Sequence, residues 1–226
     1  MTLPSGSATA LFLDLDGTLA DSMPLMRIIY DEFLGRRGLM PRTEEFNGFA
    51  GLTIPRIMEQ LNQTRRMGES PREMTAEWSA LVDARYLAEV RPAPGAHELL
   101  DAAARRGVFT ALVTSSPAAL AREFLARHRL LDWFQEIVSA ERVTRGKPDP
   151  EPFRLALDLS GRPAREGLAV EDALAGAMSA TGAGLATYVM ALTPPPEGLT
   201  ELPGVRGVIR SLAELIPRLT PEPGQG

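Results

Sequence analysis

Short apolar runs, each ending in polar residues, recur along the chain and predict buried parallel strands. Four are clear and a fifth is less regular, at residues 10–15, 108–113, 136–138, 168–170 and 184–190. Segments of helical periodicity lie between them, at about 96–106, 118–129, 150–159 and 174–181. Strands that alternate with helices indicate βαβ units, so we predict an α/β fold with a doubly wound parallel sheet. Because such crossovers are right-handed, the loops after the strands gather at one sheet edge, where ligands bind.

The segment 19–91 interrupts this alternation. It holds three helical stretches, at about 23–37, 54–66 and 71–88, and no convincing strand. The prolines of the following Arg91-Pro92-Ala93-Pro94-Gly95 stiffen the chain as a hinge would. So long an excursion between two strands favours an inserted domain over helices packed on the sheet. We therefore predict a core of residues 1–18 and 92–226 and a helical cap domain of residues 19–91.

Composition narrows the classes of partner. The 226 residues carry a net charge of −5, which argues against nucleic acid or an anionic membrane as a generic partner. The absence of cysteine excludes disulfides and thiolate metal sites. No apolar run reaches the roughly eighteen residues of a membrane span, and the first ten residues lack a secretory pattern. We expect a cytoplasmic protein with no membrane partner, either a monomer or a homodimer.

Two carboxylates follow the first apolar run, Asp14 and Asp16, and Gly17 then permits a sharp turn. Paired carboxylates at a strand end suit Mg²⁺, which prefers oxygen ligands. One carboxylate can attack phosphorus while its neighbour donates a proton to the leaving oxygen and later activates water. Acidic residues at a strand end are also common as turn or helix caps. The spacing by itself leaves both interpretations open.

The flanking sequence adds a resemblance to a known family. Asp14-Leu15-Asp16-Gly17-Thr18 resembles the first motif of the haloacid dehalogenase-like hydrolase superfamily, in the capped branch that holds phosphoglycolate phosphatases and β-phosphoglucomutases. Three segments resemble its further motifs in the family's order: Val113-Thr114-Ser115-Ser116, Gly146-Lys147-Pro148-Asp149-Pro150 and Val170-Glu171-Asp172. Four ordered motifs are a far stronger signal than any one of them. The resemblance covers nearly the whole chain and implies a Rossmann-like core, a Mg²⁺ cofactor and a phosphoric monoester hydrolase.

The resemblance also implies a role for each matching residue. Asp14 is the expected nucleophile, Asp16 the general acid and base, and Thr114 a hydrogen-bond partner of the phosphoryl group. Lys147 is expected to balance the negative charge of the carboxylates and of the substrate. The implied metal ligands are Asp14, Asp16, Asp172 and Glu171. The implied phosphate- and substrate-binding residues are Thr114, Ser115 and Lys147, with Gly51 and Arg56 in a glycine-containing specificity loop of the cap.

Plainer interpretations stand beside these roles. A single lysine is ordinarily a solvated surface residue, but Lys147 is the one lysine among 24 basic residues and falls in a family motif. Asp172 and the 114–116 hydroxyls are equally typical of helix caps. Ala173 replaces a serine found in many relatives, and we expect no metal ligand to be lost by this change.

Three observations narrow the chemistry within the family. Asp16 argues against the dehalogenase branch, which lacks this second aspartate. The absence of lysine from residues 19–91 argues against the phosphonate-cleaving branch, which needs a cap lysine. Ile54 occupies the place of an arginine in phosphoglucomutases, which weakens that interpretation. Arg56, two positions later, either binds a substrate carboxylate or second phosphate or faces solvent.

We therefore predict a Mg²⁺-dependent phosphatase that hydrolyses a small phosphorylated metabolite through an aspartyl-phosphate. A sugar phosphomutase and a non-catalytic phosphate-sensing module are the alternatives. A pair of carboxylates fit for nucleophile and proton donor speaks against the sensing module, since binding alone needs no proton donor. Phosphoglycolate, a sugar phosphate, a nucleotide and pyrophosphate remain open as substrates.

Overall fold

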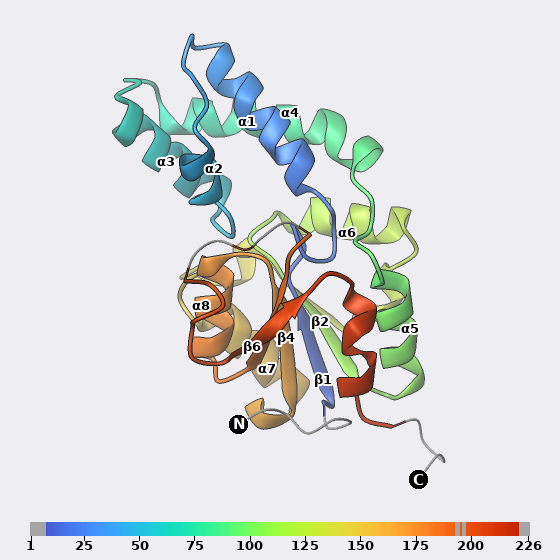
Figure 1. Cartoon of the computed structure of the whole chain (residues 1–226). Helices are drawn as coiled ribbons and strands as arrows, with labels where there is room; N and C mark the ends of the chain where they lie inside the picture. Colours follow the sequence, from blue (N-terminus) through green and yellow to red (C-terminus); the bar gives the residue numbers. More distant parts are fainter. Residues whose placement is uncertain (1–7, 193–194, 196–197, 222–226) are drawn as a thin grey trace.

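The computed structural model describes residues 8–192, 195 and 198–221. Six parallel strands form one sheet in the order β3-β2-β1-β4-β5-β6 (Figure 1). The strands are β1 (Ala10–Leu13), β2 (Phe109–Val113), β3 (Glu136–Val138), β4 (Gly167–Glu171), β5 (Ala186–Met190) and β6 (Val205–Ile209). The chain reverses its direction of winding at β1, so the predicted doubly wound α/β fold is confirmed.

The central strand β1 is buried on both faces. Leu13 pairs with Leu112 of β2 on one side and with Val170 of β4 on the other. Successive side chains point to opposite faces, so Leu11 and Leu13 enter one hydrophobic cluster while Ala10 and Phe12 enter the other. This two-sided burial explains why the strand reads as a continuous apolar run.

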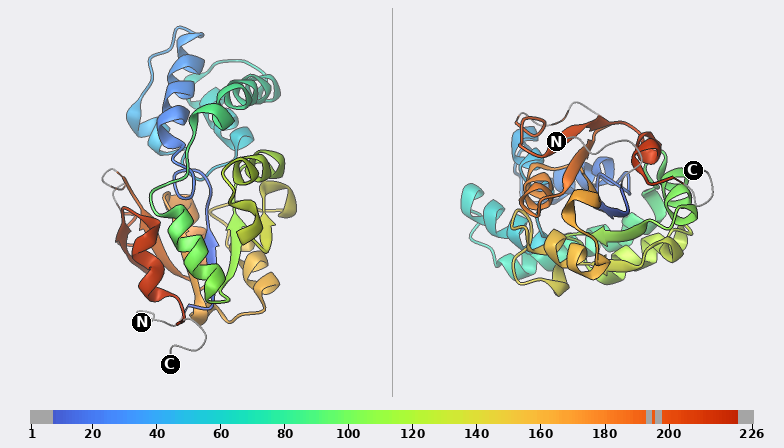
Figure 2. Two further views of the ribbon diagram at one scale, coloured as in Figure 1. Left: turned by 90° about the vertical axis from the view of Figure 1, so that its right-hand side faces the viewer. Right: turned by 90° about the horizontal axis from the view of Figure 1, so that it is seen from below.

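Helices cover both faces of the sheet (Figure 2). The core helices are α5 (Ala96–Arg105), α6 (Ala118–Arg127), α7 (Glu151–Ser160) and α8 (Leu174–Gly182). Short 3₁₀ turns complete the connections, at Leu131–Trp133, Ala140–Arg142, Ala164–Glu166 and Leu212–Arg218. Leu99 of α5 and Phe124 of α6 belong to the same hydrophobic cluster as Leu11, whereas Phe153 of α7 and Ala180 of α8 belong to the cluster of Phe12.

Four helices stand above the carboxyl edge of the sheet (Figures 1 and 2). They are α1 (Met23–Gly35), α2 (Thr43–Asn47), α3 (Ile54–Arg65) and α4 (Pro71–Glu89). Two chain segments lead to and from them side by side: Asp21 N donates to Arg91 O at 2.9 Å and Ala93 N donates to Leu19 O at 2.8 Å. This narrow connection supports our proposed division into a core and a cap of residues 19–91.

The predicted helices and strands all occur, with ends within two residues of those expected. Among the α-helices and strands of the described residues, two were not predicted, α2 and β6. The five residues of α2 bury none of their side chains, so no apolar stripe marks it. β6 lies at the sheet edge, contains Arg206 and Gly207, and leaves Val208 41% exposed, so it lacks an unbroken apolar run. Within the described residues, no helix is long and apolar enough to cross a membrane.

Candidate active site

Three neighbouring strands bring the predicted residues to one edge of the sheet. Asp14 follows β1, Thr114 follows β2, and Asp172 follows β4. The ladder continues one residue beyond the strands, because Asp14 N donates to Val170 O at 3.1 Å and Thr114 N donates to Val138 O at 2.9 Å. Since the strands are parallel and adjacent, these side chains meet at the position where ligands bind in doubly wound folds.

Lys147 reaches this edge from the loop before α7. Its Nζ donates to Asp14 Oδ1 at 2.6 Å, to Glu171 Oε1 at 2.5 Å and to Val113 O at 2.9 Å. These three contacts use all three ammonium protons, and the side chain is only 1% exposed. The surface interpretation of this lysine is therefore wrong. A guanidinium would present a planar fork to a space that now holds a compact ammonium.

The carboxylates of the site carry unusual pKa values. Burial raises the pKa of Asp14 to about 8, with Lys147 opposing the rise and Glu171 adding to it. Burial also raises the pKa of Glu171, and burial with the nearby Asp14 holds the pKa of Asp172 well above its ordinary value. Burial would lower the pKa of Lys147, but the attraction of Asp14 and Glu171 outweighs it and raises the pKa. One ammonium thus faces more carboxylates than it can balance.

The arrangement fits a hard divalent cation. Asp14, Glu171 and Asp172 each offer a carboxylate oxygen, and these oxygens lie within 4.8 Å of one another. Glu171 Oε2 is buried and has no hydrogen-bond partner among the described residues. An oxygen-only donor set with surplus negative charge is what Mg²⁺ prefers. The carboxylate of Asp16 lies outside this cluster, so its predicted part in metal binding remains a prediction.

Gly17 lets the first loop turn sharply beside Asp172, one of the candidate metal ligands. Its φ of +79° lies in the left-handed region, which other residues rarely adopt. A Cβ at this position would also lie 2.0 Å from Asp172 Oδ2. Glycine is therefore required twice, by the turn and by the space that the Asp172 carboxylate occupies.

The carboxylate of Asp16 is held by two hydroxyls. Tyr86 Oη donates to Asp16 Oδ1 at 2.7 Å, and Ser116 Oγ donates to Asp16 Oδ2 at 2.6 Å. Tyr86 belongs to α4 of the cap and is completely buried, whereas Ser116 lies in the core loop after β2. Burial raises the pKa of Tyr86 well above its ordinary value, and the Asp16 carboxylate adds to the rise. The tyrosine is therefore a fixed neutral donor that ties the cap to Asp16.

The remaining residues of the second motif divide their contacts between core and cap. Thr114 Oγ1 accepts a hydrogen bond from Ser116 N at 3.0 Å and lies in a pocket that Lys147 also lines. Ser115 Oγ donates to Gly51 O of the cap at 2.8 Å. Gly51 has a φ of +78°, and a Cβ there would lie 3.2 Å from Ala173 Cβ. The alanine after the acidic pair thus lies directly under the cap.

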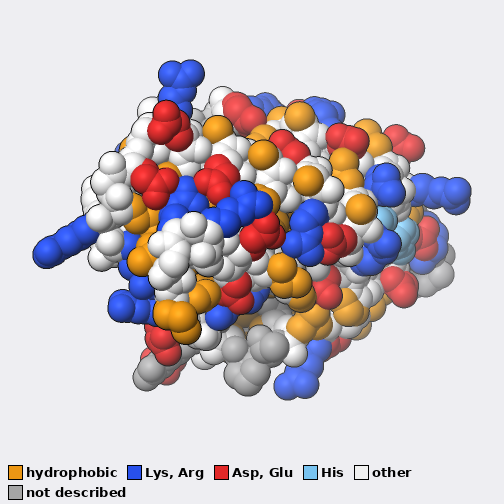
Figure 3. Space-filling view, turned by 90° about the horizontal axis from the view of Figure 1, so that it is seen from above, with side chains coloured by type: hydrophobic (Ala, Val, Ile, Leu, Met, Phe, Trp, Pro, Cys, Tyr) orange, Lys and Arg blue, Asp and Glu red, His pale blue; other side chains and the backbone are white. Residues whose placement is uncertain are grey.

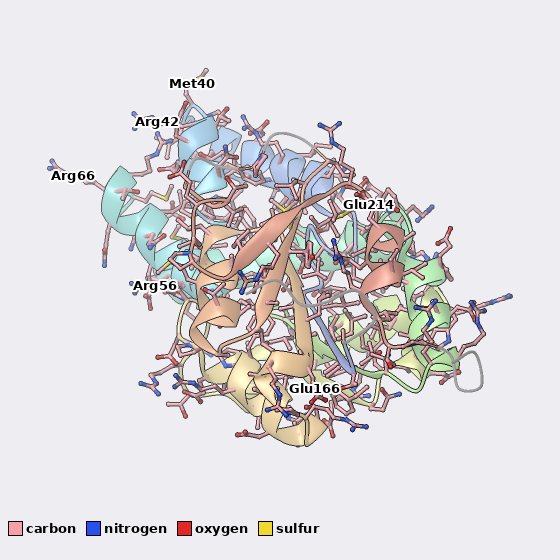
Figure 4. The ribbon with its side chains drawn as sticks, turned by 60° about the horizontal axis from the view of Figure 1, so that its bottom comes forward. Met40, Arg42, Arg56, Arg66, Glu166 and Glu214 are labelled. Atoms are coloured by element: carbon pink, nitrogen blue, oxygen red, sulfur yellow. The ribbon has the colours of Figure 1, made fainter. Side chains whose placement is uncertain are left out.

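Arg56 is a predicted residue that makes no contact with Asp14 or Asp16. Its side chain is 61% exposed and pairs with Glu59 at 3.4 Å. Figure 4 shows Arg56 at the outer edge of the molecule. It lines an open groove with Arg145 and Lys147 rather than meeting Asp14 or Asp16. The prediction that Arg56 contacts a substrate stays untested.

Sequence reasoning missed Tyr86, although a signal was present. Met74, Trp78, Val82 and Tyr86 recur at every fourth position of α4 and are all buried. Such spacing marks one helix face, and Tyr86 is the only member of this stripe that carries a hydroxyl. A polar tip at the end of an apolar stripe was the clue to a buried hydrogen bond.

Known proteins resemble this chain over most of its length. The family model described as haloacid dehalogenase-like hydrolase matches residues 11–190. Hexitol phosphatase A of Escherichia coli (strain K12) is 34% identical over 190 residues, covering 81% of this chain and 82% of that protein. A plasmid-encoded phosphoglycolate phosphatase of Cupriavidus necator is 30% identical over 232 aligned residues, covering 98% and 97%.

Solved structures share the fold over almost the whole chain. A hydrolase from Pseudomonas syringae superposes with a TM-score of 0.77 at 24% identity, covering 92% of this chain and 96% of that one. CbbY from Rhodobacter sphaeroides, in complex with phosphate, superposes with a TM-score of 0.74 at 23% identity, with the same coverage.

Proposed function

The chain belongs to the haloacid dehalogenase-like hydrolase family and is a phosphatase of that family, and we propose that it hydrolyses a small phosphorylated metabolite through an aspartyl-phosphate on Asp14. One observation carries this proposal. Asp14 lies at the switch point of the sheet, bound to Lys147 at 2.6 Å and within a cluster of carboxylates. Two residues later, Asp16 turns its carboxylate towards the cap.

Mg²⁺ is the cofactor that we propose, held by Asp14, Asp172 and Glu171, with Asp16 as a predicted further ligand. When bound, it would neutralise charge on the phosphoryl oxygens and lower the repulsion between substrate and carboxylates. Lys147 supplies a second positive charge next to Asp14. Its contacts also keep the Asp14 carboxylate in one orientation, which preorganises the nucleophile.

The proposed reaction has two steps. In the first, a carboxylate oxygen of Asp14 forms a bond to phosphorus while the bond to the leaving oxygen breaks, and Asp16 gives that oxygen a proton. In the second, Asp16 takes a proton from water as the water oxygen attacks phosphorus. The bond from phosphorus to Asp14 then breaks, which releases phosphate and restores the carboxylate. Thr114 and nearby N–H groups are the proposed donors to the phosphoryl oxygens.

Several further assignments accompany this proposal. We retain a cytoplasmic location, and a monomer or homodimer, as parts of it. The face of the molecule seen from the cap side in Figure 3 has acidic and basic side chains interspersed, which fits a small-molecule substrate better than nucleic acid. The exposed position of Arg56 gives no support to a phosphomutase, which needs a firm hold on a second phosphate.

Metal dependence and a nucleophile variant test the proposal together. The protein is expected to release phosphate from an aryl phosphate in the presence of Mg²⁺, and to stop when the metal is chelated. Asp14→Asn is expected to lower kcat by at least about 10³-fold, because an amide cannot form the acyl phosphate.

Asp158→Asn is the matched control, since Asp158 is an exposed aspartate on α7. It should keep the rate of the unmodified protein. Full activity in excess chelator would remove the metal from the mechanism, and a near-normal rate for Asp14→Asn would remove the nucleophile.

A further inference from the structure

A cavity of about 100 Å³ lies between the cap and the catalytic loops. Asp16 and Ser116 lie at its wall, and the rest of the lining is apolar or glycine. The principal apolar residues are Met26, Phe46, Leu52, Trp78, Val82 and Leu120. Aromatic rings give this lining a large apolar area, and the methionine adapts to irregular shapes.

The two polar residues of the lining already hydrogen-bond to each other. Ser116 Oγ donates to Asp16 Oδ2 at 2.6 Å, and Tyr86 Oη donates to Asp16 Oδ1 at 2.7 Å. The Ser116 proton is therefore committed to Asp16. In the proposed reaction Asp16 gives the leaving oxygen one proton. Apart from Asp16 and Ser116, the one side chain of the lining with a hydrogen-bonding group is Trp78, whose indole N–H can donate but not accept.

Among the described residues, no lysine or arginine lines this cavity. Arg56 and Arg145 flank the groove beside Lys147, with side chains 61% and 69% exposed. Neither lines the cavity that contains Asp16. A carboxylate placed in that cavity would lose its hydration without gaining a cation, and each buried unpaired hydroxyl would cost on the order of tenfold in affinity.

We propose that this cavity receives the leaving group, and that the preferred substrates are phosphate monoesters of apolar alcohols. The inference rests on the proposed function, because Asp16 must lie against the leaving oxygen to protonate it. The apolar walls then stabilise the alcohol by removing its carbon chain from water. Hydroxyl-rich and carboxylate-bearing esters are disfavoured, including the classes after which the two relatives are named.

Matched pairs of esters test this preference. Hexyl phosphate and a hexitol phosphate share six carbons and differ in hydroxyls, while ethyl phosphate and phosphoglycolate share two carbons and differ in a carboxylate. We expect kcat/KM to favour the apolar member of each pair by at least tenfold. Along linear alkyl phosphates from ethyl upwards, kcat/KM should rise about fourfold per methylene until the cavity is filled. These alcohols differ little in acidity, so the series reports binding.

A variant locates the effect in the cavity. Leu120→Gln places an amide in the lining and should lower the ratio of hexyl to ethyl phosphate turnover by about tenfold. Leu159→Gln is the matched control, because Leu159 is a 39% exposed leucine on α7, away from the cavity. It should keep the ratio of the unmodified protein.

Binding of the product alcohol gives a readout that needs no turnover. The chain has two tryptophans, and Trp78 lines the cavity. In a Trp133→Phe background, hexanol should change the fluorescence of Trp78 with saturation, and a hexitol should not.

The outcomes separate the inference from the function on which it rests. Preference for phosphoglycolate or for the hexitol phosphate, or a flat alkyl series, overturns the inference and leaves the phosphatase proposal intact. Phosphate release from none of the esters with Mg²⁺ overturns the proposed function, and the fluorescence titration then decides the inference: saturation by hexanol supports an apolar alcohol site, and no response overturns it.

Discussion

At the scale of single residues, Gly17 shows how closely the first loop and the fourth motif fit. The glycine has no Cβ where the Asp172 carboxylate lies, and its backbone is left-handed. The loop after β1 and the loop after β4 are therefore in close contact, so a larger residue at position 17 would displace Asp172. This dependence connects residues 155 positions apart (17 and 172), and it follows from the adjacency of β1 and β4.

Gly17→Ala should abolish turnover, because the new methyl group displaces the Asp172 carboxylate from the proposed metal site. Gly38→Ala is a matched control: Gly38 has a φ of +66°, and a Cβ there would meet nothing within 4 Å. In both variants the left-handed backbone lowers the free energy of unfolding by about 1 kcal/mol. Thermal unfolding should therefore show a lower midpoint for each. Steady-state kinetics should separate them, with activity lost in the first alone; equal activity in both would contradict the proposed role of Asp172.

Sequence could predict the position of those candidate site residues that follow a strand or stand out in a motif. Asp14, Thr114 and Asp172 fall at the ends of adjacent strands, and Lys147 stands out as the single lysine. Sequence could not predict that Ser115 contacts Gly51 or that Tyr86 contacts Asp16, since both contacts depend on how the cap sits on the core. Whether Arg56 faces solvent depends on which face of its helix it occupies. Sequence periodicity assigns that face poorly near the start of a helix.

At the scale of elements, α4 connects the interior of the cap with the catalytic loop. Its buried face carries Trp78 and Val82 at the cavity and Tyr86 at Asp16. The ring of Tyr86 also meets that of Phe124 on α6 in an edge-on contact, with centroids 5.7 Å apart. One helix thus lines the cavity proposed for the leaving group and orients Asp16, the proposed acid.

Tyr86→Phe should slow the hydrolysis of alkyl phosphates by about tenfold while changing that of p-nitrophenyl phosphate by less than about twofold. An alkoxide needs a well-oriented proton donor, whereas nitrophenolate leaves without one. Tyr30→Phe is the matched control, because Tyr30 Oη donates to Glu45 Oε2 at 2.6 Å within the cap. Initial rates on the two esters make the comparison. An equal slowing of both esters by Tyr86→Phe would contradict a specific role of the tyrosine in protonation of the leaving oxygen.

The elements themselves were predictable wherever burial imposed a period on the sequence. β1 is buried on both faces and α5 on one, and each was predicted within two residues of its ends. β6 was not predicted, because a strand at the sheet edge with an exposed Val208 needs no apolar run. Residues 43–47 escaped because no side chain of α2 is buried.

At the scale of the whole molecule, the hydrogen bonds described above join the cap to the core at three places. Paired segments join them at residues 19–21 and 91–93, Tyr86 reaches Asp16, and Ser115 holds Gly51. The contact at Gly51 lies away from these paired segments, and we expect it to act as a latch between cap and core. A single hydrogen bond contributes about 1 kcal/mol, which favours the contact between cap and core but allows it to break readily.

Ser115→Ala should open this latch. In the substrate-free protein, hydrogen exchange of residues 48–54 is expected to rise about fivefold, corresponding to about 1 kcal/mol, while exchange in α1 stays unchanged. Ser160→Ala is the control, since Ser160 Oγ donates to Leu157 O within α7 at 2.6 Å. Unchanged exchange together with a raised KM would instead place Ser115 at the phosphate, as the motif first suggested.

The burial of Lys147 protects the one lysine side chain of the protein from amine-reactive reagents. The chain holds one lysine, and its amine is 1% exposed. Amine-reactive labels, crosslinkers and enzymes that modify lysine therefore find no accessible side-chain amine on the native surface. A label that does attach at residue 147 has entered an opened catalytic centre. The rate of acylation at Lys147 therefore measures how often this site opens, and no engineered probe is required.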